Sequence, residues 1–307
     1  MNRLASPVPS LALPGHHCPV QSLAFNHSGR LLATGDTSRH LRAWFNSRPF
    51  FEAEVRTRVD KVRGTDRIRG MAFSPEGRRL YVVCGDTLRA YDLLHRLEMW
   101  RYQPRRSFGL LVVSPVAVAV SPAGNVLTAA DSGTVCALDP NGRRLARWWD
   151  NEAPRHFAFT PDGASIVGVD GFSIGVWDAY SGRKLRRQPS EERIFGMALA
   201  PLSGIVAVRT LHTVQLHSLS TLELLDRVPA PTGLPLMSFS PDGSVLALAG
   251  REEVLVSAPG DPDAVVLPTT GARVLSLAFH PAGSFLAAGC SDGVIRFWDV
   301  FAGPSVK

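Results

Sequence analysis

The sequence predicts an all-β protein, a single seven-bladed β-propeller that occupies residues 1–307. Three observations lead to this fold class. A turn that ends in glycine recurs seven times at a nearly constant spacing. The segments beside these turns are short and apolar on both faces, as buried strands are. The last repeat lacks a fourth strand, which the N-terminus can supply.

The recurring turns define the repeats. They are Asn26–Gly29, Ser74–Gly77, Ser121–Gly124, Thr160–Gly163, Ala200–Gly204, Ser240–Gly243 and His280–Gly283. Successive turn glycines are 48, 47, 39, 41, 39 and 40 residues apart, close to the roughly 40 to 45 residues of a four-stranded propeller blade. Proline sets φ for the first corner of such a turn, and glycine takes the left-handed position that closes the hairpin. The chain is therefore expected to form seven blades.

Apolar segments flank each turn, as the first and last repeats show. In the first repeat they are Val20–Phe25 and Leu31–Gly35. In the last repeat they are Leu275–Phe279 and Phe285–Gly289. Strands that are apolar on both faces suit sheets that pack face to face around a central axis.

Two segments carry a family resemblance, Ser291–Asp299 with the letters SDGVIRFWD and Val176–Asp178 with the letters VWD. They resemble the Trp-Asp (WD) repeat family, and the resemblance extends over nearly the whole chain. The dipeptide position is degenerate in the other five repeats, which read Trp44-Phe45, Tyr91-Asp92, Leu138-Asp139, Leu216-His217 and Val256-Ser257. The resemblance implies that each blade has four strands.

The resemblance also implies how the ring closes and how the first blade is braced. The final repeat ends after three strands, so Pro9–Leu13 is expected to be its fourth strand. A hydrogen-bond chain is expected from His16 through Thr34 to Trp44. Ser38 stands where the turn aspartate of such a chain is expected, so the first blade should be less rigid than its relatives.

The amino-acid composition limits the classes of protein to which the chain can belong. The chain has 45% hydrophobic and 20% charged residues, typical of globular proteins. No apolar stretch matches a secretory signal, and Leu110–Val120 is shorter than the ~20 residues of a bilayer-spanning helix. The four cysteines form no CxxC pair, so no zinc or redox motif is spelled out. We expect a cytoplasmic monomer with no cofactor and no membrane contact.

Charge divides the chain into two unequal halves. Residues 1–150 contain 21 basic and 12 acidic residues, whereas residues 151–307 contain 12 and 15. Thirty of the 33 basic residues are arginines, a bias that does not by itself indicate phosphate binding, which uses lysine as well. A nucleic-acid partner is therefore not favoured.

Catalytic motifs are nearly absent. The sequence contains no HExxH, GxxxxGK[ST] or GxGxxG motif, and its nine histidines have no metal-ligand spacing within a repeat. Gly171–Gly175 does match the GxSxG motif of α/β-hydrolases, with Ser173 as the nucleophile. That motif requires a strand followed by a helix, whereas this segment falls in a predicted hairpin. We therefore predict that the protein is not an enzyme.

Cationic residues recur where the innermost strands begin. In the aligned repeats, Arg67, Arg193 and Arg273 precede the strand, and Arg69 and Arg155 lie two positions later. The loops between second and third strands add Arg39, His40, Phe172, His212 and Arg251. Arginine and aromatic side chains are favoured at binding hot spots. The alternative is that these are solvated loop charges, some of them paired with Asp66, Glu191 or Glu192.

The first two repeats are longer than the others by about eight residues. The added length falls in Asn46–Asp66, which contains Phe50 and Phe51, and in Leu93–Ser114, which contains Trp100 and Tyr102. Basic residues including Arg105 and Arg106 are interleaved with these rings. An acidic partner or nucleic acid would suit this pattern, and a long outer hairpin that covers the blade edge explains it equally well.

Two functions from different classes fit the sequence. The first is a non-catalytic scaffold that binds partner proteins or acidic peptides on one rim of the propeller, the rim that the WD resemblance implies for partners. The second is a propeller enzyme, such as a lactonase-like hydrolase, with a site in the axial channel. The enzyme would need carboxylates or histidines that converge from several blades. The residues at the start of the innermost strands are instead mainly arginines.

Overall fold

The computed structural model describes residues 9–55, 67–103, 115–130, 133–149, 154, 156–200, 202–230, 236–261 and 263–300. These residues form 28 β-strands in seven four-stranded antiparallel sheets, which are the blades. No helix within the described ranges is long and apolar enough to cross a membrane.

The first four blades follow one another along the chain. Blade 1 contains β2 (Val20–Phe25), β3 (Leu31–Asp36), β4 (His40–Phe45) and β5 (Arg48–Glu54). Blade 2 contains β6 (Ile68–Phe73), β7 (Arg79–Cys84), β8 (Thr87–Asp92) and β9 (Leu97–Tyr102). Blade 3 contains β10 (Pro115–Val120), β11 (Val126–Ala130), β12 (Thr134–Leu138) and β13 (Arg144–Trp149). Blade 4 contains β14 (His156–Phe159), β15 (Ser165–Val169), β16 (Ser173–Asp178) and β17 (Lys184–Pro189).

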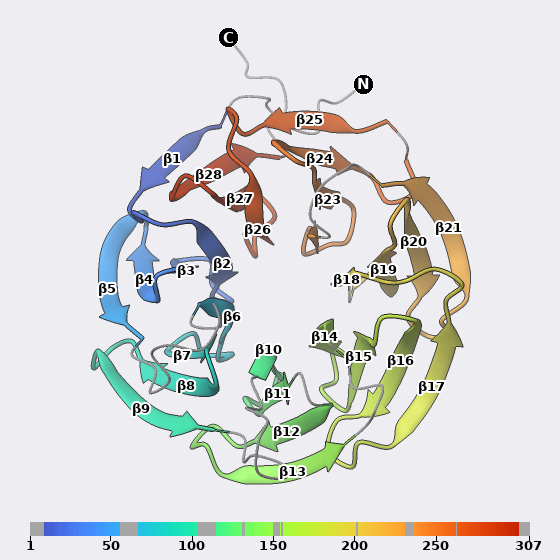
Figure 1. Ribbon diagram of the computed structural model, residues 1–307, viewed down its shortest axis with the longest axis horizontal. Helices are drawn as coiled ribbons and strands as arrows, with labels where there is room; N and C mark the ends of the chain where they lie inside the picture. Colours follow the sequence, from blue (N-terminus) through green and yellow to red (C-terminus); the bar gives the residue numbers. More distant parts are fainter. Residues whose placement is uncertain are drawn as a thin grey trace.

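The remaining blades complete the ring. Blade 5 contains β18 (Gly196–Ala200), β19 (Ile205–Arg209), β20 (Thr213–Ser218) and β21 (Leu224–Pro229). Blade 6 contains β22 (Met237–Phe239), β23 (Leu246–Ala249), β24 (Glu253–Ser257) and β25 (Val265–Pro268). Blade 7 contains β26 (Val274–Phe279), β27 (Phe285–Cys290), β28 (Val294–Asp299) and β1 (Leu11–Pro14). The first strand of each blade lies nearest the axis, and neighbouring inner strands pack together all around it (Figure 1). The predicted seven-bladed propeller is confirmed.

The turn between the first two strands of each blade has the predicted chemistry. All seven turn glycines have positive φ, between 66° and 84°. In blade 6, Gly243 N–H donates to Ser240 O at 2.9 Å, and the Asp242 carboxylate accepts hydrogen bonds from Ser240 Oγ and Ser244 N–H. The left-handed glycine and the side-chain bonds close the hairpin, so the local sequence determines each turn.

The N-terminal strand closes the ring, as predicted. Strand β1 pairs antiparallel with β28, from Leu11 opposite Phe297 to Pro14 opposite Val294. The strand lies one to two residues later than the predicted Pro9–Leu13. Figure 1 shows the blue N-terminal strand on the outer side of the red C-terminal blade. Blade 7 thus combines one strand from the N-terminal part of the chain with three strands from the C-terminal part.

The core lies between neighbouring blades. The first residue of the degenerate WD dipeptide is buried in every blade. These residues are Trp44, Tyr91, Leu138, Trp177, Leu216, Val256 and Trp298. Position therefore matters more than residue type, because any large or branched apolar side chain can fill the space between two sheets.

The extra length of the first two repeats falls after their outer strands, between Glu54 and Ile68 and between Tyr102 and Pro115, mostly outside the described residues. Phe50 and Phe51 belong to β5, and Trp100 and Tyr102 belong to β9. These four rings thus lie on the outer strand that every blade has, and the outer-hairpin interpretation of the added length stays a prediction. Arg105 and Arg106 lie outside the described residues.

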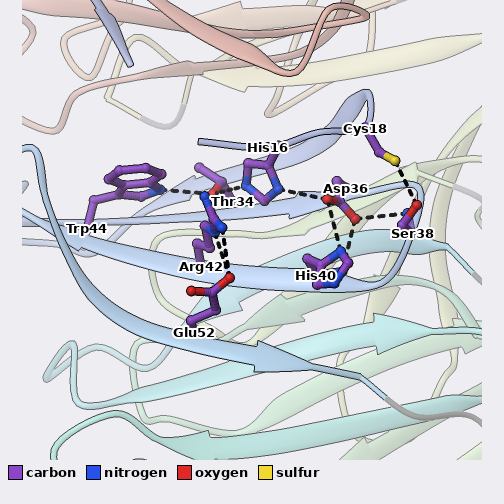
Figure 2. A network of polar contacts seen from close by, with 9 residues as sticks. All are labelled: His16, Cys18, Thr34, Asp36, Ser38, His40, Arg42, Trp44 and Glu52. Carbon is purple, nitrogen blue, oxygen red and sulfur yellow. Dashed lines mark hydrogen bonds and ion pairs between the residues drawn. The ribbon is translucent and has the colours of Figure 1, made fainter. Parts of the chain in front are cut away.

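Ser38 occupies the turn position as predicted, but the expected gap in the hydrogen-bond chain is absent, because Asp36 supplies the acid. Asp36, two residues before Ser38, is buried and its Oδ2 lies 2.9 Å from His16 Nδ1. His16 Nε2 lies 2.7 Å from Thr34 Oγ1, which also accepts a hydrogen bond from Trp44 Nε1 at 2.9 Å. The remaining Asp36 oxygen accepts the backbone N–H groups of Ser38 and His40 (Figure 2). The chain from Trp44 to the turn is therefore complete.

Asp36→Asn is expected to destabilise the fold by roughly 1 to 3 kcal/mol near neutral pH, the usual effect of leaving buried polar groups unsatisfied. Burial alone raises the pKa of Asp36, but hydrogen bonds from His16, His40 N–H and Ser38 N–H outweigh it and hold the pKa below its ordinary value of 3.8. A lowered folded-state pKa stabilises the protein above the unfolded pKa, and this contribution disappears as pH falls through the folded value. Urea unfolding should therefore show a large difference between the two proteins at pH 6 and a smaller one at pH 3. Equal stability at pH 6 would contradict the role assigned to Asp36.

Candidate partner-binding rim

One end of the propeller carries the predicted binding residues. Because neighbouring strands of a blade are antiparallel, the second strand ends and the third begins at the end where the first strand begins. We call this end the upper rim. It consists of the segments that precede the innermost strands and the loops between second and third strands. The described residues of the predicted site on this rim are Arg39, His40, Arg67, Arg69, Phe172, Arg193, Arg251 and Arg273. Arg155 lies outside the described residues.

Two predicted residues are tied into blade 1. Arg39 Nη2 lies 3.6 Å from Glu54 Oε1, and His40 Nδ1 lies 3.5 Å from the buried Asp36 carboxylate. Arg39 also has a φ of 72°, which fixes the turn between β3 and β4. These contacts favour a structural role for both residues.

Three arginines remain available on other blades. Arg67, Arg251 and Arg273 are exposed, and within the described ranges none of them makes an ion pair. They lie at blades 2, 6 and 7, so they share a rim but are spread around it. Arg69, within β6, is half-buried. The rim thus presents separated positive charges at three blades.

At the junction of blades 4 and 5, backbone hydrogen bonds join the loops of the upper rim. Ile194 N–H donates to Gly171 O at 2.7 Å, and Ser190 N–H donates to Phe172 O at 2.9 Å. Phe195 N–H donates to Arg209 O at 2.8 Å, which links the same segment to the end of β19. These backbone bonds hold the β15–β16 loop against the segment that leads into β18.

A cavity of about 210 Å³ lies at this junction. Its lining consists of His156, Val169, Asp170, Gly171, Phe172, Arg193, Ile194 and Phe195. The Arg193 guanidinium lies 5.4 Å from the centre of the Phe195 ring, a cation–π contact. The structure therefore brings together two of the predicted residues, Phe172 and Arg193.

Sequence reasoning missed two exposed apolar residues of this rim, Phe195 and Leu211. Their exposed fractions are 37% and 65%, and that of Phe172 is 60%. Leu211 could have been found from the sequence, because it is an apolar residue in a turn whose equivalent in the last blade, Ser291–Gly293, is polar. Phe195 could not be placed, because its strand begins at Gly196 and the alignment of repeats does not determine loop geometry.

The GxSxG match has a structural explanation. Ser173 is 1% exposed, and its Oγ donates to Asp170 Oδ2 at 2.6 Å and accepts from Arg187 Nε at 3.1 Å. The Asp170 carboxylate also accepts the N–H groups of Phe172 and Ser173. Ser173 begins strand β16 and stabilises the turn before it, so its hydroxyl is not accessible to a substrate.

A metal-dependent site finds no support in the described residues. Within the ranges that the structure covers, no group of three or more His, Cys, Asp or Glu side chains is placed to hold a metal ion. The buried His16 and His217 are instead hydrogen-bonded to protein groups, His16 to Asp36 and Thr34, and His217 to Leu222 O.

Comparison with known proteins is consistent with this architecture. The family model "WD domain, G-beta repeat" matches residues 7–44 and 265–299, which adjoin at the ring closure. Transducin beta-like protein 2 of Mus musculus is 23% identical, over 95% of this chain and 72% of the relative. Telomerase protein component 1 of Mus musculus is 27% identical, over 60% of this chain but 7% of the relative. Serine-threonine kinase receptor-associated protein of Gallus gallus is 22% identical, over 47% of this chain and 42% of the relative.

The match spans less than half the length of two of these three relatives. The family model covers the two blades that meet at the closure, the relatives extend the similarity over the rest of the chain, and the structure shows seven four-stranded blades. The chain is therefore similar to WD-repeat proteins, with the family match at the two blades that meet at the ring closure, and it folds as a seven-bladed β-propeller.

Proposed function

We propose that this protein is a non-catalytic scaffold that binds partner proteins, through acidic segments, on its upper rim. The main support is the set of exposed arginines without ion pairs among the described residues, Arg67, Arg251 and Arg273, which lie on one rim of three different blades. Charges arranged in this way steer a complementary partner and fix its orientation. A cytoplasmic location and a monomeric state stay predictions.

Two features of the protein fit a scaffold better than a propeller hydrolase. The serine of the only hydrolase motif is enclosed. The rim charges are mainly guanidinium groups, which bind carboxylates and phosphates in bidentate fashion but do not exchange protons near neutral pH. Such groups suit recognition better than general acid or base catalysis.

Reversing two rim charges, Arg251→Glu with Arg273→Glu, is expected to weaken binding of acidic peptides about tenfold or more. The probes are twelve-residue peptides selected from a random display library on the wild-type protein, with affinity measured by fluorescence anisotropy. Tenfold corresponds to about 1.4 kcal/mol, within reach of two lost charge contacts. The expected selected peptides are acidic.

The control reverses two exposed arginines on outer strands, Arg186 on β17 and Arg227 on β21. This variant has the same net charge as the rim variant, so it should retain the affinity of the wild type if position decides binding. Equal losses in both variants would indicate a general charge effect and would refute the rim as the binding site.

A further inference from the structure

The junction of blades 4 and 5 carries a second, chemically different feature of the upper rim. Fifteen large hydrophobic side chains are exposed among the described residues. Three of them lie on the upper rim, Phe172, Phe195 and Leu211, and all three belong to these two neighbouring blades. Exposed apolar side chains that gather in one place mark an interaction site, whereas single ones do not. Phe172 and Phe195 line one cavity, and Leu211 lies on the next loop of blade 5; we call these three residues the apolar patch.

We propose that the cavity beside the apolar patch receives one large apolar side chain of a partner peptide, and that Arg193 pairs with an acidic residue next to that side chain. This inference rests on the proposed function and names the chemistry of one subsite within it. The ligand is a short segment in which a bulky hydrophobic residue is flanked by glutamate or aspartate.

The size of the cavity favours a side chain over a free small molecule. Its volume of about 210 Å³ is below the roughly 300 to 1,000 Å³ of small-molecule pockets. Phe172 and Phe195 line it, and Ile194, 4% exposed, anchors the wall to the core. Gly171, which also lines it, has a φ of 111°, and apart from its two chain neighbours no described residue lies within 4 Å of the position that a Cβ would take.

The charges at the cavity favour an acidic ligand. Arg193 is exposed, stacks on Phe195, and makes no ion pair within the described part of the chain. The carboxylate of Asp170 is instead occupied by the hydrogen bonds that it accepts from Phe172 N–H, Ser173 N–H and Ser173 Oγ. Of the two glutamates that precede Arg193, Glu192 has one carboxylate oxygen enclosed in the protein, and Glu191 is exposed. An arginine on an aromatic face is pre-positioned to pair with a carboxylate.

The rigidity of the junction supports a preformed site. Hydrogen bonds from Ile194 N–H, Ser190 N–H and Phe195 N–H fix the loop segments relative to strands β15 and β19. Asp170 holds the turn that carries Phe172. A site that is ordered before binding avoids the entropy loss of ordering loops.

The test uses fluorescein-labelled nonapeptides with one central residue flanked on each side by two glutamates. The central residue is phenylalanine, leucine, tryptophan or alanine, and a second series replaces glutamate by glutamine. Anisotropy titrations should show that at least one bulky central residue binds about tenfold more tightly than alanine. The glutamine series should bind about tenfold more weakly than the glutamate series.

Two variants locate the binding. Phe172→Ser should reduce the preference for a bulky central residue, and Arg193→Gln should remove most of the difference between the glutamate and glutamine series. Both residues are exposed, so both variants should keep the melting temperature of the wild type. The matched controls are Leu225→Ser, 59% exposed on the outer strand β21, and Arg227→Gln on the same strand; neither should change the affinity.

Three outcomes would overturn this inference. They are equal affinity for bulky and alanine peptides, unchanged preference in Phe172→Ser, and absence of binding by every nonapeptide at concentrations up to about 1 mM. The peptides selected from the random library decide the wider proposal separately. If their binding depends on Arg251 and Arg273 but not on Phe172 or Arg193, the rim function stands and the subsite at blades 4 and 5 is wrong.

Discussion

Removal of residues 1–15 is expected to lower the melting temperature by roughly 5 to 10 °C. The deletion removes β1, which supplies the fourth strand of blade 7 through its pairing with β28. It also removes Leu13, which packs against a core cluster that contains Trp44, Ile295 and Phe297. Leu13 is half-buried, so it contributes less than the ~1.5 to 3 kcal/mol of a fully buried leucine. Each lost hydrogen bond costs about 0.5 to 1.5 kcal/mol, and 1 kcal/mol shifts the melting temperature of a large domain by about 2 to 4 °C.

The same deletion affects the neighbouring blade. Gly15 lies against the Trp44 ring so closely that a Cβ would not fit, and Trp44 takes part in the hydrogen-bond chain of blade 1. Differential scanning calorimetry of the truncated and full-length chains measures the loss. An unchanged melting temperature would refute closure of the ring by the N-terminal strand.

Point variants in β1 distinguish the loss of side-chain packing from the loss of the whole strand. Leu13→Asp should lower the melting temperature, because this side chain faces the core cluster. Leu11→Asp should have little effect, because Leu11 is 41% exposed on the same strand. An unchanged melting temperature in both variants would mean that β1 is held by its backbone pairing alone.

Trp177→Ala is expected to cost roughly 3 to 5 kcal/mol of the free energy of unfolding, the range for a large aromatic residue removed from a core. Trp177 is 1% exposed and lies in a cluster with Leu127 and Val135 of blade 3 and Ile166 of blade 4. The ring covers Gly175 so closely that a Cβ there would not fit. Alanine would therefore leave a cavity between two blades.

Urea unfolding of Trp177→Ala should be compared with that of Tyr180→Ala. Tyr180 lies three residues later in the same blade and is 41% exposed, so its removal should cost less than about 1 kcal/mol. A loss below about 1 kcal/mol for Trp177→Ala would show that the blades do not depend on this ring for cohesion.

The turns were predictable from sequence because their energetics are local. A Pro-Asp-Gly segment such as Pro241–Gly243 contains the fixed φ, the carboxylate acceptor and the left-handed glycine that its hairpin requires. Seven turns that end in glycine determine the number of blades. The missing fourth strand of the last repeat likewise pointed to the N-terminus, because an unpaired sheet edge needs a cover.

The position of the acid in the hydrogen-bond chain of blade 1 did not follow from the sequence. The resemblance placed the acid of the hydrogen-bond chain inside the β3–β4 turn, whereas the structure uses Asp36 at the end of β3. From that position the Asp36 carboxylate reaches both His16 and the turn N–H groups. Residues two positions apart along a strand lie on the same face. The alternating sequence pattern therefore does not show which of the two positions supplies the acid.

The sequence alone determined the repeat, the number of blades, the closing strand and the rim on which the arginines lie, because spacing and turn chemistry act over a few residues. Only the tertiary structure decided which rim residues are engaged. Arg39 pairs with Glu54, whereas Arg193 stacks on Phe195 beside a cavity formed by two blades. Such contacts join residues from different loops, and their geometry follows from the packing of whole blades, which no local pattern contains.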